Sequence, residues 1–152
     1  MRRFACLLCA ALLAGCAETQ DQSETADTAE SADMAPAGIT LADVSGTWNV
    51  RVMPENGDTV LSTYRLEATG AAWTINFPDR EPIPVSILAV EGDSIVTIAG
   101  PFSSSVRPNV MVTVETVFRL QNETLVSRTV AHYAVTTPDS VVVLRAEGTR
   151  AQ

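Results

Sequence analysis

The sequence predicts an all-β domain that runs from about residue 44 to the end of the chain. Apolar and polar residues alternate there with the period of two that is typical of half-buried strands, most clearly from Val110 to Leu120. Residues that favour turns separate these runs, and no convincing helical pattern lies between them. The expected strands lie at about 46–54, 59–69, 73–77, 84–91, 94–100, 110–120, 124–135 and 140–150.

The connections between these segments are mostly short, which predicts an antiparallel meander in which each strand pairs with the next. Eight such strands can close into an up-and-down β-barrel, and closure removes the exposed sheet edges. An open β-sandwich is the alternative fold. The dipeptide Asn56-Gly57 after the first strand predicts a two-residue hairpin turn of type I′, because that turn needs two positive φ angles.

Composition divides the chain into a leader at 1–15, a segment at 16–38 and the β-domain at 39–152. The leader has Arg2 and Arg3 followed by an apolar stretch from Phe4 to Ala14. These 11 residues are about half of the roughly 20 needed for a membrane-spanning helix. A basic start and a short apolar stretch are typical of a cleaved signal peptide.

Leu13-Ala14-Gly15-Cys16 ends the leader and resembles the lipobox of bacterial lipoproteins at every position. The resemblance implies cleavage before Cys16, a diacylglyceryl group on its sulfur and acylation of the freed amino group. Two or three acyl chains would hold the protein firmly on a membrane. By the sorting rule of Gram-negative lipoproteins, Ala17 after the cysteine implies the outer membrane. An ordinary signal peptide with an accidental cysteine is the alternative.

Residues 17–38 have the composition of a flexible, acidic spacer. They contain no aromatic and no basic residue, and their carboxylates recur at every third position. Low hydrophobicity with charge of one sign is typical of disorder, and a random coil of this length spans roughly 25 Å. A strip that binds calcium or a partner is the alternative interpretation. The acidic residues are Glu18, Asp21, Glu24, Asp27, Glu30 and Asp33.

Charge and cysteine content exclude several classes of function. The chain has 10 arginines, no lysine and 18 carboxylates, so its formal net charge is −8. This balance argues against nucleic acid as a partner and against electrostatic docking on anionic lipid. Cys6 and Cys9 leave with the leader, so the domain keeps only Cys16 and is expected to hold no disulfide and no thiolate metal site.

Gly46-Thr47-Trp48 at the start of the first strand resembles the Gly-x-Trp signature of lipocalins and related calycin barrels. In that family the tryptophan closes one end of an eight-stranded barrel, and a basic residue of the last strand packs across its ring. The resemblance implies that Arg145 or Arg150 makes this contact with Trp48. The chain departs from the family pattern because it is shorter than a typical lipocalin and lacks both the family's helix and a disulfide.

A lipocalin-like barrel implies a small apolar ligand in its interior. Trp48, Tyr64 and Phe118 are the predicted lining, and the small inward residues of the seventh strand would leave a void. A filled core is the alternative. Residues 83–90 and 141–144 are apolar on both faces, which predicts an apolar outer surface that a partner, a second copy or the chain's own tail would cover.

The sequence gives no support for catalysis, a metal or a cofactor. His132 is the only histidine, and neither Ser104 nor Asp139 has the surroundings of a nucleophile in a triad with it. We therefore expect a membrane-anchored envelope lipoprotein that is not an enzyme. It either binds a small apolar ligand or serves as a structural or protein-interaction accessory.

Overall fold

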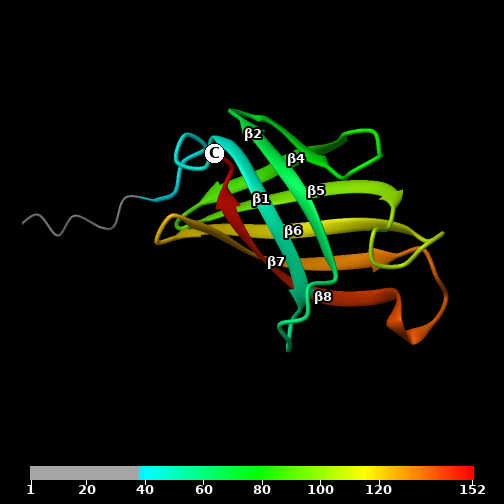
Figure 1. Cartoon of the computed structure of the whole chain (residues 1–152). Coiled ribbons are helices and arrows are strands. Elements are labelled where there is room, and N and C mark those ends of the chain that lie inside the picture. Colours follow the sequence, from blue (N-terminus) through cyan, green and yellow to red (C-terminus); the bar gives the residue numbers. More distant parts are fainter. Residues whose placement is uncertain (1–37) are drawn as a thin grey trace, which may run out of the picture. The chain divides into compact units, whose positions relative to one another are not determined.

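A computed structural model of the chain describes residues 38–152, which form a closed, antiparallel eight-stranded barrel (Figure 1). The predicted barrel is confirmed, and the open β-sandwich is excluded because β1 pairs with both β2 and β8. The strands are β1 (Gly46–Pro54), β2 (Ser62–Thr69), β3 (Ala72–Asn76), β4 (Ile83–Glu91), β5 (Ser94–Ser103), β6 (Met111–Gln121), β7 (Thr124–Tyr133) and β8 (Val141–Arg150).

Every strand pairs with its neighbour in sequence, so the topology is up-and-down, and it is consistent with a lipocalin-like fold. The only helical element among residues 38–152 is a single 3-10 turn, η1 (Pro138–Ser140), before β8. No helix in this part of the chain is long and apolar enough to cross a membrane. The predicted leader, lipobox and acidic spacer up to residue 37 lie outside the described residues.

The two ends of the barrel are built differently. At one end, two-residue turns join β2 to β3, β4 to β5 and β6 to β7, and the first described residues and the C-terminus lie at this same end (Figure 1). The opposite end carries the four longer connections, at residues 55–61, 77–82, 104–110 and 134–140. We call these the closed end and the loop end.

The hairpin prediction at Asn56-Gly57 was wrong. Neither residue has a positive φ angle, and β2 begins only at Ser62, so a loop of seven residues replaces the two-residue turn. The loop is held by Arg145, which donates from Nη2 to the Gly57 carbonyl at 3.0 Å and contacts the Asp58 carboxylate. Tertiary contacts therefore override the local preference. Two consecutive positive φ angles occur instead at Asn122 and Glu123, between β6 and β7.

The predicted alternation of side chains is confirmed by burial. Trp48, Leu66 and Phe118 face inward and are essentially inaccessible, whereas their chain neighbours are more exposed. The Phe118 ring packs edge-on against Trp73 at 5.6 Å between centroids. A second buried group, formed by Val112, Ala131, Tyr133 and Leu144, fills the interior toward the loop end.

Candidate functional site

The closed end is sealed by Trp48 and Arg150. The Arg150 guanidinium carbon lies 4.3 Å from the centroid of the Trp48 ring, so the cation covers the aromatic face. Trp48 Nε1 donates to the Val44 carbonyl at 2.8 Å, inside the core. Of the two arginines that the lipocalin resemblance indicated, Arg150 makes the contact, and Arg145 holds the loop between β1 and β2 instead.

Arg150 also ties the N-terminal turn to the last strand. Its two Nη atoms donate to the carbonyls of Ser45 and Asp43, each at 2.7 Å. Gly46 has a φ of 125°, and a Cβ at this position would lie 3.1 Å from Arg150 Nη1. Glycine therefore supplies both the unusual backbone angle and the room for the guanidinium. Trp48 and Arg150 thus form a structural cap at this end.

The barrel interior contains one small cavity near the loop end, with a volume of about 60 Å³. This volume holds a few water molecules at most, since one water takes about 30 Å³ in the liquid. Pockets for drug-sized ligands measure about 300–1,000 Å³. The cavity is lined mainly by apolar side chains, among them Phe77, Phe102 and Tyr133.

The three predicted ligand-binding residues do not meet around this cavity. Tyr64 lines it, and burial inside the barrel raises the pKa of its hydroxyl above the usual value. Trp48 belongs to the cap, and Phe118 packs in the core against Trp73. Alternation correctly predicts that all three side chains face the barrel interior. Their positions along the barrel axis depend on the strand register, which alternation does not give.

A row of threonine hydroxyls crosses the interior, and two of its members, Thr116 and Thr129, line the cavity. Thr97, Thr116 and Thr129 are register partners on β5, β6 and β7. Thr97 Oγ1 donates to the main-chain carbonyl of Thr116 at 3.3 Å, and the side chains of Thr116 and Thr129 are joined by a 3.0 Å hydrogen bond between their Oγ1 atoms. Among residues 38–152, Ser127 Oγ is the buried side-chain polar atom without a hydrogen-bond partner.

The loop between β5 and β6 covers the cavity, and several polar contacts hold it in place. Ser62 Oγ donates to Ser105 Oγ at 2.9 Å, which ties the loop to β2. Arg107 pairs with Asp139 at 2.8 Å, and its guanidinium lies 4.3 Å from the centroid of the Tyr133 ring. The buried Ser104 Oγ accepts from the amides of Val106 and Arg107. Ser105 and Val106 thus form a lid over the cavity.

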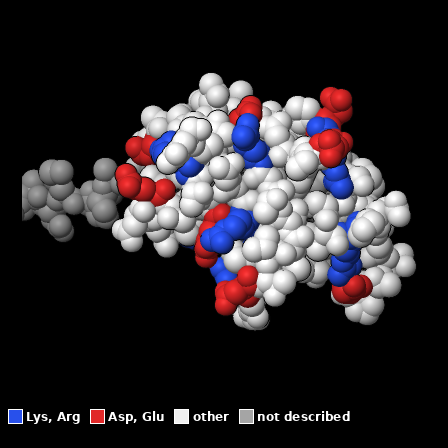
Figure 2. All heavy atoms as spheres, viewed as in Figure 1, with Lys and Arg blue, Asp and Glu red and all other residues white. Residues whose placement is uncertain are grey.

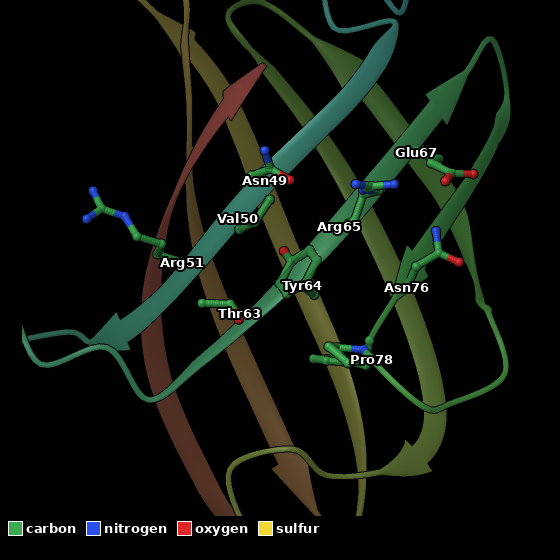
Figure 3. Close-up of a pocket in the computed structure, with 10 residues that line it drawn as sticks. Asn49, Val50, Arg51, Thr63, Tyr64, Arg65, Glu67, Asn76 and Pro78 are labelled. Carbon is green, nitrogen blue, oxygen red and sulfur yellow. The ribbon is translucent and has the colours of Figure 1, made fainter. Parts of the chain in front are cut away.

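A much larger hollow, of about 610 Å³, lies on the outer surface of the barrel over β1, β2 and the end of β3. Figure 3 shows its outward side chains, with Arg65 between Asn49 and Asn76. These three residues are direct register partners on adjacent strands, so they form one polar row across the sheet. Arg51, Thr63 and Glu67 flank the row.

Arg65 differs from every other arginine of the described domain. The other seven arginines of residues 38–152 each pair with a carboxylate, donate to a carbonyl or cover an aromatic ring. Arg65 makes no ion pair and no side-chain hydrogen bond within this part of the chain. We refer to the row Asn49–Arg65–Asn76 as the polar row.

The outer surface elsewhere mixes charged and apolar side chains. Figure 2 shows the charged groups in view as neighbouring blue and red clusters, with no continuous blue stripe. Leu88 on β4 and Val141 on β8 are 58% and 50% exposed, so both strands that the sequence predicted to be apolar on two faces present an apolar side chain outside.

The residues considered for a catalytic triad serve other contacts. Ser104 and Asp139 hold the loops at the loop end, and His132 lies exposed on the outer face of β7. Within residues 38–152, no three His, Cys, Asp or Glu side chains come close enough to hold a metal ion. No protein-family model, curated protein or solved structure matches this chain.

Sequence reasoning missed the outer hollow. The alternating pattern does place Asn49, Arg65 and Asn76 on outward positions, but it does not tell which residues of different strands are neighbours. Only the register puts an arginine between two amides. That Arg65 has no ion pair among residues 38–152 likewise depends on the positions of the acidic side chains in the fold.

The cap at the closed end predicts a specific loss of stability for Arg150→Gln. The variant loses the cation–π contact and two bonds to carbonyls, so we expect the free energy of unfolding to fall by about 1–3 kcal/mol. The control is Arg128→Gln, which removes an exposed ion pair with Glu55 and should cost below about 1 kcal/mol. Urea unfolding followed by tryptophan fluorescence measures both. Equal losses in the two variants would contradict a stabilising cap.

Proposed function

We propose that this chain is a lipid-anchored envelope lipoprotein that acts through the outer surface of its barrel, as an interaction module. The observation that carries the proposal is the contrast between the interior cavity of about 60 Å³ and the outer hollow of about 610 Å³. A filled interior leaves little room for a carried lipid. An open hollow of mixed lining, with a cation that has no ion pair among residues 38–152, offers a surface for recognition.

The place where the chain enters the barrel is consistent with an anchored module. Ile39 donates its amide to the Gly92 carbonyl at 2.8 Å, so the chain joins the barrel at the closed end. The hollow lies on the side of the barrel, over β1 to β3. A flexible spacer from Cys16 would let this side face a partner while the acyl chains stay in the membrane.

Lipidation is tested by replacing the predicted acylated residue. In a Gram-negative host fed an alkyne fatty acid, we expect the wild-type chain to be labelled and to stay with the outer membrane. Cys16→Ser should abolish the labelling, because it removes the sulfur that carries the lipid. Cys9→Ser, a change within the leader, is the matched control and should be labelled normally. Labelling of Cys16→Ser equal to wild type would contradict the anchor.

Contact through the hollow is tested by photo-crosslinking in intact cells. A diazirine amino acid at position 63, inside the hollow, should give defined adducts that mass spectrometry detects. The same residue at position 88, on the exposed outer side of β4, is the comparison and should give few. Adducts at position 88 with none at 63 would contradict this proposal and would indicate that the partner contacts the apolar outer face of β4.

A small neutral ligand beneath the lid is the second candidate function. It is favoured by the mainly apolar cavity, by the hydroxyls of Thr116 and Thr129 in its lining and by the polar contacts that hold the lid. Because the cavity holds a few waters at most, a larger ligand would have to displace lining residues such as Ser105 and Val106. A charged ligand is disfavoured, since no charged side chain lines the cavity.

Native mass spectrometry of the purified full chain tests this second function. A bound neutral mass should be present in the wild type and absent in Ala131→Leu, because Ala131 lines the cavity and the larger side chain fills it. Ala134→Leu, at an exposed position, should retain the mass. Wild-type chain that carries no added mass would argue against an interior ligand.

A further inference from the structure

We propose that the outer hollow binds an acidic saccharide, with a sugar carboxylate on Arg65 and hydroxyl or acylamido groups on the flanking amides and alcohols. This inference rests on the proposed function, for which it names the chemistry of the bound partner.

The Arg65 guanidinium, which has no ion pair among residues 38–152, indicates a carboxylate ligand. Residues 38–152 contain twelve carboxylate side chains and eight arginines, so acids are in excess, and yet none reaches Arg65. Its neighbour Glu67 also lines the hollow but makes no ion pair with it. The planar guanidinium presents parallel N–H donors that match the two oxygens of a carboxylate. A ligand can therefore supply the carboxylate that no residue of 38–152 provides to Arg65.

The groups around Arg65 favour a hydroxyl-rich ligand. Asn49 and Asn76 stand on either side of it in register, and Thr63 lines the same hollow. Amides and alcohols both donate and accept hydrogen bonds, as sugar hydroxyl and acylamido groups do. Because adjacent strands lie about 4.8 Å apart, the polar row spans about 10 Å. That is the length of a disaccharide.

The closed barrel argues against an extended peptide in the same place. A peptide commonly adds as a strand to a free sheet edge. Here β1 is paired on both sides, with β2 and β8, and β2 is paired on both sides as well, with β1 and β3. A ligand in the hollow must therefore use side chains, and the polar row supplies only polar ones.

The overall negative charge of the protein does not prevent this contact. Charges farther apart than about 8 Å are largely screened at physiological ionic strength, whereas a direct guanidinium–carboxylate pair is local. Glu67, which also lines the hollow, lies two residues from Arg65 on the same strand, about 7 Å away, and is therefore only weakly screened. It opposes a ligand carboxylate at its own position but accepts hydrogen bonds from ligand hydroxyls, so the ligand must place its carboxylate on Arg65 and hydroxyls beside Glu67.

Isothermal titration of the full chain with defined hexasaccharides tests the inference. The protein is kept in lauryldimethylamine oxide, because a sugar detergent would compete. We expect binding of a galacturonate hexamer or a hyaluronan hexamer, both of which carry carboxylates, and none of chitohexaose in its fully N-acetylated form, which is neutral. Arg65→Gln should weaken that binding about tenfold or more, and Arg65→Lys should weaken it less.

Arg128→Gln is the matched control, because Arg128 is an exposed outer arginine on another strand. It should bind as the wild type does. We expect the variants to melt at the temperature of the wild type, because Arg65 makes no ion pair and no side-chain hydrogen bond within residues 38–152. Failure of both acidic hexamers to bind, equal binding of chitohexaose, or an unaltered affinity in Arg65→Gln would overturn the saccharide assignment. Crosslinks from position 63 without saccharide binding would still support an interaction through the hollow. They would refute only the acidic saccharide as its partner.

Discussion

The structure depends on one constraint, the closure of the sheet by β1, which pairs with β2 on one side and with β8 on the other. Closure leaves the sheet without a free edge. It also makes the inward side chains of all eight strands share one narrow interior. Large inward side chains such as Trp48, Trp73 and Phe118 then fill most of that space. The small interior volume follows from this filling.

Closure also fixes the different roles of the two ends. An up-and-down order places the turns after even-numbered strands at one end and those after odd-numbered strands at the other. The short turns and both chain ends meet at the closed end, where Arg150 covers Trp48 and binds the N-terminal turn. The longer loops meet at the opposite end, and the lid residues Ser105 and Val106 cover the cavity there.

A barrel whose interior is filled can still present functional groups outside. The outward side chains of adjacent strands are brought into rows by the same register that packs the core. In this chain one row places an arginine between two amides, away from the acids that pair with most other arginines. Recognition at the outer face therefore does not require the core to open. Outward residues can also change without changing the inward residues that stabilise the barrel.

The sequence by itself determined the eight β-segments and the inward side of the strands that alternate clearly, because period two and turn residues are local properties. It did not choose an inward side for residues 83–90 and 141–144, which are apolar on both faces. The lipocalin resemblance limited the arginines that could cover Trp48 to two. Only the tertiary structure decided that Arg150 covers the ring, that Arg145 remodels the loop at Asn56-Gly57, and that Trp48 and Phe118 fill the core instead of lining a cavity. Each of these outcomes depends on strand register and on contacts between distant segments. Alternation along a single strand shows which side chains face inward. It does not show which residue of the adjacent strand lies beside each of them.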